Sequence, residues 1–136
     1  MNFAQIMKAA TVVFMLGASQ AYADDVECWA KVHGKKNVMN ATIADDGTFA
    51  RTSNNGWVET QEDTIFSWMA MDPTRAGAEY YDTFKAPNGY SIVKMGTSAN
   101  EMKIGVSADR TKGFYEYTDH GSSANNAQIV LTCKKI

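Results

Sequence analysis

The sequence predicts an all-β fold, a small single-domain antiparallel β-barrel built as a meander of about eight to ten short strands, with a β-sandwich as the second choice. Apolar and polar residues alternate with a period of two through most of the chain after residue 24, as they do in half-buried strands. Turn-forming residues recur about every eight to twelve positions, which is the spacing typical of sandwiches and barrels. Helical periodicity is weak throughout, and only residues 72–80 suggest a single helical turn.

Residues 1–23 have the pattern of a secretory signal peptide, so the domain is expected to span residues 24–136. Lys8 supplies the positive charge of the N-terminal region, and an apolar run follows at residues 9–18. Ala21-Tyr22-Ala23 then gives the small-x-small pattern that signal peptidase accepts. The apolar run is much shorter than the roughly 20 residues of a membrane-spanning helix. We therefore expect cleavage before Asp24, a periplasmic or secreted protein, and no stable membrane insertion after cleavage.

The first half of the domain contains five expected strands separated by strong turn signals. Asp45-Asp46-Gly47 and Asn54-Asn55-Gly56 are turn sequences, because Asn, Asp and Gly tolerate the positive φ angles of tight hairpins. Residues 64–71 are apolar on both faces, which suits a strand under a loop or beside a ligand cavity. The expected strands are 26–33 (followed by a turn at 34–37), 38–44, 48–52, 57–60 and 64–71.

The second half continues the same rhythm. The clearest alternation is at residues 101–107, where Met102, Ile104 and Val106 are expected to point inward. Glu101, Lys103 and Ser107 are expected to point outward, and Gly113 is expected to adopt the left-handed conformation that ends the turn at residues 109–113. The expected strands are 79–85, 90–95, 101–107, 114–118 and 128–133, with turns at 87–89 and 97–100 and a loop at 121–126.

Cys28 and Cys133, which lie near the two ends of the domain, are predicted to form a disulfide. An even cysteine count in an exported chain favours a disulfide, and strand alternation places both cysteines on the apolar faces of their strands. The bond requires the first and last strands to lie side by side, which would close a barrel, or to face each other across a core. A zinc or redox pair is disfavoured because the sequence offers no further ligands at metal spacing and no C-x-x-C motif.

Charge and motif content exclude several function classes. The net charge of −2 and the lack of basic clusters beyond two lysine pairs argue against nucleic-acid binding. No motif indicates a metal site, a cofactor or a catalytic centre, since acidic pairs such as Asp45-Asp46 are explained by turn chemistry. The alternative in the enzyme class is a small hydrolase that uses His33 or His120, the two histidines of the chain.

Aromatic residues are the best candidates for a binding surface. Core packing explains some of them, but Tyr80 and Tyr81 are adjacent and must point to opposite faces of a strand. We predict a non-enzymatic protein that binds a small apolar ligand or a protein partner through aromatic side chains. The candidate residues are Trp29, Trp57, Trp68, Tyr80, Tyr81 and Tyr90.

The signal-like start, the strand rhythm and the terminal cysteines together resemble small exported β-barrel domains. Among these are lipocalin-like ligand carriers and small periplasmic inhibitors of cell-wall hydrolases. The resemblance is architectural and carries no residue roles. It implies either the transport of an apolar ligand or the inhibition of an envelope or host hydrolase, while a structural envelope protein that assembles through exposed strands is a further alternative.

Overall fold

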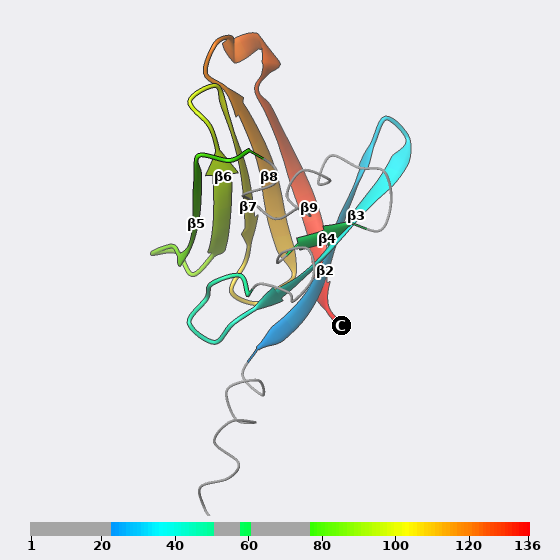
Figure 1. Ribbon diagram of the computed structural model, residues 1–136. Coiled ribbons are helices and arrows are strands. Elements are labelled where there is room, and N and C mark those ends of the chain that lie inside the picture. Colours follow the sequence, from blue (N-terminus) through cyan, green and yellow to red (C-terminus); the bar gives the residue numbers. More distant parts are fainter. Residues whose placement is uncertain (1–22, 51–57, 61–76) are drawn as a thin grey trace, which may run out of the picture.

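A computed structural model describes residues 23–50, 58–60 and 77–136, which form one antiparallel sheet of eight strands in the order β4-β3-β2-β9-β8-β7-β6-β5. The sheet curls into a half-barrel (Figure 1), which confirms the all-β, barrel-like prediction. The elements are β2 (Asp24–Val32), β3 (Lys35–Ile43), β4 (Val58–Thr60), β5 (Tyr80–Lys85), β6 (Ser91–Gly96), β7 (Asn100–Val106), β8 (Lys112–Asp119), the 3₁₀ turn η1 (Ser123–Asn125) and β9 (Ala127–Lys135).

The sheet is a meander whose first and last strands lie side by side. Strands β2 and β9 pair with each other, while β4 and β5 are its two edges within the described residues. The segment after β3 leans against β5, because the Phe49 N–H donates to the Thr83 hydroxyl oxygen at 2.8 Å. The Thr83 hydroxyl in turn donates to the Ile92 carbonyl at 3.0 Å. These two hydrogen bonds connect the segment after β3 to β5 and β6.

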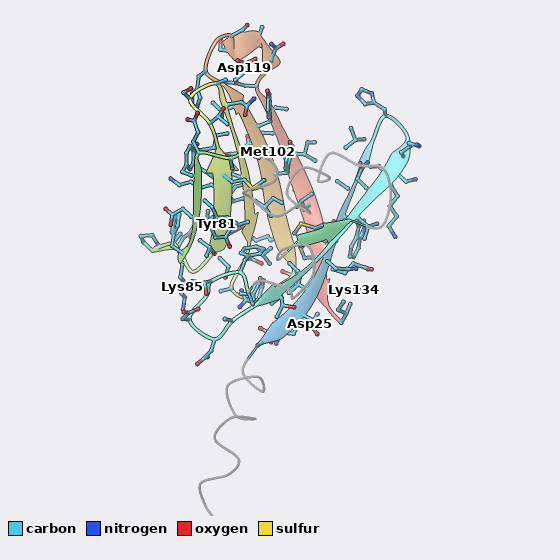
Figure 2. All side chains as sticks on the ribbon, viewed as in Figure 1. Asp25, Tyr81, Lys85, Met102, Asp119 and Lys134 are labelled. Carbon is cyan, nitrogen blue, oxygen red and sulfur yellow. A yellow bond between two sulfur atoms is a disulfide. The ribbon has the colours of Figure 1, made fainter. Side chains whose placement is uncertain are left out.

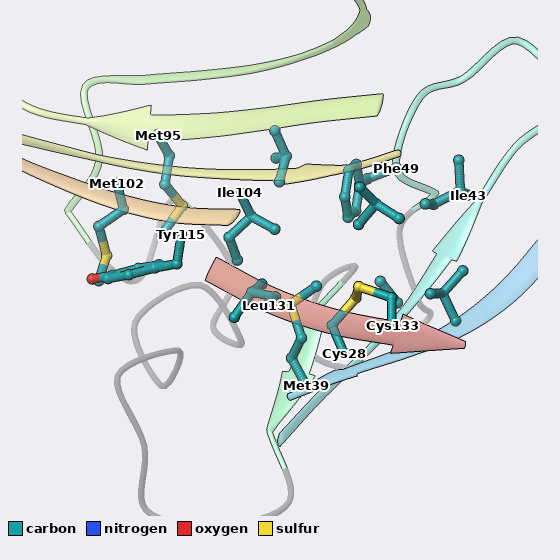
Figure 3. Close-up of a cluster of buried hydrophobic side chains, with 14 residues drawn as sticks. Cys28, Met39, Ile43, Phe49, Met95, Met102, Ile104, Tyr115, Leu131 and Cys133 are labelled. Carbon is teal, nitrogen blue, oxygen red and sulfur yellow. A yellow bond between two sulfur atoms is a disulfide. The ribbon is translucent and has the colours of Figure 1, made fainter. Parts of the chain in front are cut away.

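The concave face of the sheet carries the hydrophobic core (Figure 3). Met102, Ile104 and Val106 point into it as predicted, because successive side chains of a strand alternate between its two faces. The prediction for Ser107 is wrong, since only 4% of it is exposed. Its hydroxyl donates to the Asp109 carboxylate and accepts from two backbone amides of the next turn. The main core residues are Val26, Cys28, Met39, Ile43, Phe49, Val93, Met95, Ile104, Val106, Tyr115, Leu131 and Cys133.

The predicted disulfide is present and joins β2 to β9, the first and last described strands of the chain. Cys28 and Cys133 are direct partners in the β2–β9 ladder, with 4.1 Å between their Cα atoms. Both side chains are buried in the core. A disulfide is compatible with an oxidising compartment outside the cytosol.

Two predicted turns differ from the structure. The β2–β3 hairpin turns at His33 and Gly34 rather than over residues 34–37, and both residues have positive φ angles of 53° and 78°. A two-residue turn with this geometry matches the twist of a hairpin, so the second strand begins already at Lys35. In the later turn the left-handed residue is Arg110, with φ 64°, and not Gly113. Gly113 lies in β8, where a Cβ atom would clash with the Gly105 carbonyl oxygen.

Several expectations fall wholly or partly outside the described residues. These are the signal peptide up to residue 22, the turn at 54–56, the strand at 64–71 and most of the helical turn at 72–80. Of the strand expected at 48–52, the described part shows a single bridge between Ile43 and Phe49. The strand expected at 57–60 is present as β4. Within the described part of the chain, no helix has the length and apolar character needed to cross a membrane.

Candidate binding groove between strands β2 and β9

Strands β2 and β9 pair over only part of their length. Their ladder has four steps, from Val26 opposite Lys135 to Trp29 opposite Thr132. Strand β2 continues to Val32, and β9 begins earlier, at Ala127. Beyond the last pair the two strands diverge, with the β2–β3 hairpin swinging away from β8 and β9 (Figure 1). We call this opening the fork.

The fork opens away from the start of β2 and the end of β9. Asp25 and Lys134 lie at the closed end, where the two strands are paired, whereas Asp119 lies near the loop that precedes β9 at the opposite end (Figure 2). The fork is therefore bounded by the β2–β3 hairpin on one side and by the first half of β9 on the other.

Backbone hydrogen-bonding groups of both strands face into the fork. The Cys133 N–H donates to the Thr111 carbonyl beside β8, whereas the Ile136 N–H donates to the Asp25 carbonyl beside β2. Because backbone groups alternate between the two neighbours of a strand, the even-numbered residues of β9 face β2. Val130 and Gln128 therefore direct their N–H and C=O groups into the fork.

The same alternation applies to β2. The short Cα separation at the disulfide fits a narrow, non-hydrogen-bonded pair, so Trp29 and Thr132 form the adjacent hydrogen-bonded pair. The next hydrogen-bonding residue of β2 is Lys31, whose ladder partner would be Val130. The β2–β9 ladder ends before this step, so within the described residues Lys31, Val130 and Gln128 have no β-ladder partner on this side.

Side chains around the fork line a groove of about 510 Å³. This volume lies within the range of roughly 300 to 1,000 Å³ that is usual for ligand sites. Its walls combine an aromatic ring, aliphatic side chains and two cations. The lining residues are Trp29, Ala30, Lys31, Lys36, Ile129, Val130 and Thr132.

The aromatic wall of the groove is Trp29, one of the predicted binding residues. Its side chain is half-buried on the outer face of β2. The Lys36 Nζ atom lies 5.4 Å from the centre of the Trp29 ring, in cation–π contact. The ring thus offers an apolar surface beside a positive charge.

Two lysines stand directly opposite each other at the mouth of the groove. Lys31 pairs with Lys36 in the β2–β3 ladder, and both are exposed. Like charges in this position destabilise a sheet. The corresponding outer-face pair in β7 and β8, Lys103 and Glu116, is complementary. Within the described residues neither groove lysine makes an ion pair, so this part of an acidic protein is locally basic.

The aliphatic wall includes an unusually exposed apolar side chain. Val130 is 78% exposed, the largest value among the exposed large hydrophobic residues of the described chain. It points to the outer face, opposite the buried Leu131, and lies beside the groove. A single exposed valine is ordinary on a protein surface, but this one lines the same groove as an indole ring, next to backbone groups that lack a ladder partner in the described part of the chain.

The other predicted aromatic residues do not gather at the fork. The Tyr80 hydroxyl, on the outer face of β5, donates to Glu101 Oε1 at 2.6 Å. Partial burial, reinforced by this hydrogen bond and the negative charge of Glu101, raises the pKa of Tyr80 to about 12. Tyr81 points the other way and packs against the core. Tyr90 contacts the Phe114 ring, with 5.9 Å between ring centres. Trp57 and Trp68 lie outside the described residues.

Sequence reasoning missed Lys31, Lys36 and Val130. Lys31 lies opposite Lys36 because the hairpin turns at His33 and Gly34. The turn predicted over residues 34–37 places Lys36 in the turn, so that prediction contains no such pair. A positive φ at a histidine is uncommon, so the sequence contains only a weak signal for this register.

The two histidines occupy separate loops of the described chain. His33 is exposed in the hairpin turn, and His120 is exposed after β8. Across the described residues, His, Cys, Asp and Glu side chains form no group of three suited to hold a metal ion.

Comparisons with models of known protein families, with characterised proteins and with solved structures find no match for this chain. The geometry of the groove is therefore the basis for any functional proposal.

Proposed function

We propose that this protein is an exported, non-enzymatic binding protein that holds a protein partner in the groove at the fork. The observation that carries the proposal is the end of the β2–β9 ladder after Trp29 and Thr132. At this point an indole ring and an exposed valine lie beside backbone groups that have no β-ladder partner among the described residues. Such a combination supplies both the hydrogen bonds and the apolar contact that polypeptide binding uses.

A protein partner fits the groove better than a small apolar ligand does. Small-molecule sites are usually concave and enclosed, with few charges. This groove is bordered by two exposed lysines and by strand edges, and the core side chains fill the concave face of the sheet between the described strands. An envelope or host hydrolase that the protein inhibits is one class of such a partner. The disulfide supports function in an oxidising, exported compartment.

The proposal is tested with peptides selected from a random displayed library against the full oxidised chain. Their affinities are then measured for the wild type, for Val130→Glu and for Phe84→Glu. Phe84 is a matched control, because it is an exposed apolar residue on β5 and the substitution adds the same charge. Circular dichroism melts establish that both variants fold.

We expect Val130→Glu to weaken binding by about tenfold or more, because interface energy concentrates in a few apolar anchors. Phe84→Glu should change it by less than about twofold, since a surface contact outside the interface contributes little. If the selected peptides bind equally well to wild type and to Val130→Glu, or are weakened only by Phe84→Glu, the groove is not the binding site and the proposal fails.

A further inference from the structure

We infer that the partner enters the fork as an extended acidic segment, which adds to the open edge of β9 as a further strand. This inference rests on the proposed function and specifies the mode of binding and the chemistry of the partner. The backbone, the charges and the side-chain alternation at the fork each contribute one step to it.

The first step concerns the backbone. Val130 and Gln128 are two residues apart and direct their N–H and C=O groups to the same side, as shown by the hydrogen bonds of Cys133 and Ile136. An extended peptide placed there satisfies these groups by strand addition, in which main-chain hydrogen bonds supply much of the affinity. A helix cannot do so, since its own backbone groups are already paired.

The second step concerns charge. Lys31 and Lys36 face each other as like charges, and Lys35 is also exposed at the same hairpin. At the closed end of the same strands, by contrast, Lys134 pairs with Glu27 at 3.6 Å. A carboxylate from the partner would relieve the repulsion at the hairpin and leave the lysines charge-neutralised. The partner segment is therefore acidic.

The third step concerns alternation along the added strand. A partner residue opposite Val130 projects its side chain to the same outer face, where the groove offers the Trp29 ring. The residue two positions away on the open side of the fork, opposite Gln128, shares that face and lies beside the lysine-bearing hairpin. The position on the other side, opposite Thr132, is already occupied by Trp29 of β2. The expected pattern is an apolar or aromatic residue with an aspartate or glutamate at its second neighbour on the open side.

Three synthetic peptides test the pattern on the full oxidised chain. The first, Thr-Glu-Thr-Phe-Thr-Glu-Thr, places its acidic and aromatic side chains on one face. The second replaces both glutamates by lysine. The third, Thr-Thr-Glu-Phe-Glu-Thr-Thr, has the same composition as the first but moves the glutamates to the opposite face. We expect the first to bind most tightly, and its affinity to fall as salt is raised.

Protein variants and amide exchange complete the test. Lys31→Glu should weaken binding of the first peptide by about tenfold, because it replaces an attractive charge with a repulsive one. Lys85→Glu, at an exposed lysine at the end of β5 on the far edge of the sheet, makes the same charge change away from the groove and should alter affinity by less than about twofold. The Val130 and Gln128 amides should exchange rapidly with solvent in the free protein and slowly with the peptide bound.

Three results would overturn the inference. Binding of the lysine peptide as tight as that of the first would exclude an acidic partner. Slow exchange of the Val130 and Gln128 amides in the free protein would mean that another part of the chain already covers this edge. A dimer in sedimentation that Val130→Glu dissociates would identify a second copy as the occupant. If peptides selected from the library still depend on Val130 in the first two cases, the proposed function survives while this mode of binding does not.

Discussion

Replacing Asp24 by Asn should destabilise the protein more than the loss of an ordinary surface ion pair, because Asp24 neutralises a buried guanidinium. The Arg110 side chain is only 10% exposed. Its Nε atom donates to Asp24 Oδ2 at 3.1 Å. Its Nη1 atom donates to the Ser91 hydroxyl and to the Ser107 carbonyl, each at 3.2 Å. The charge of Arg110 thus has three protein acceptors, one of them anionic.

The size of the effect follows from exposure. A hydrogen bond to a charged group contributes about 1.5 to 3 kcal/mol, and breaking a fully buried pair costs about 3 to 5 kcal/mol. The Asp24 side chain is 33% exposed, so water partly replaces the lost charge. Asn also keeps a carbonyl acceptor for Nε. We therefore expect Asp24→Asn to lower the free energy of unfolding by about 1 to 2 kcal/mol.

Urea unfolding at neutral pH with the disulfide intact measures this loss, and Glu116→Gln serves as the control. Glu116 pairs with Lys103 at 3.8 Å, and both side chains are about one-third exposed. Glu116→Gln should lower the free energy of unfolding by less than about 1 kcal/mol, because exposed ion pairs contribute little to stability. Equal losses in the two variants would refute the reasoning, since burial of Arg110 would then make no difference.

Three other outcomes are expected. Gly105→Ala should lower the free energy of unfolding in urea by about 1 to 3 kcal/mol through overpacking, because a Cβ atom there would clash with the Phe114 ring. Gly121→Ala is the control, because the nearest atom to its Cβ would lie at 3.4 Å, and it should lower the free energy of unfolding by less than about 0.5 kcal/mol. Equal losses in Gly105→Ala and Gly121→Ala would contradict the packing argument. Reducing the disulfide, which links residues 105 positions apart, should lower the free energy of unfolding by roughly 4 to 5 kcal/mol, and a loss below about 1 kcal/mol would show that the unfolded chain gains little freedom. Tyr80 and Tyr115 should titrate near pH 12 in ultraviolet absorbance, because burial raises the pKa of each. Since the folded pKa lies above the unfolded value of about 10, the contribution of these tyrosines to stability is present below pH 10 and is lost as the pH rises towards 12. Titration of both tyrosines near pH 10 would disprove the raised pKa values.

Local alternation was enough to predict much of the sheet. Met102, Ile104 and Val106 are spaced two residues apart, so only one orientation of the strand relative to the core buries all three side chains. The cysteine pair could be predicted because each lies on the apolar face of a terminal strand. These features depend on the sequence within a single strand, where the two-residue period is reliable.

Features that depend on register or on the end of a ladder were not accessible from the sequence. The pairing of Lys31 with Lys36 depends on a turn in which His33 takes a positive φ. The exposure of Val130 depends on where β2 leaves β9, which is set by the twist of the whole sheet. Trp29 could be proposed as a binding residue from its outward parity, but its neighbours in the groove could not.

The disulfide between the first and last strands also determines how the molecule responds to tension. Residues 24–27 precede Cys28 within β2, and Lys134 and Lys135 follow Cys133 within β9. A pulling force applied at Asp24 and at Lys135 passes from one short segment to the other through the sulfur–sulfur bond. The meander between the cysteines, with its core and its fork, carries none of that load. An oxidised molecule pulled at these two residues would therefore extend by only these short segments, while a reduced molecule would lose its β2–β9 pairing first.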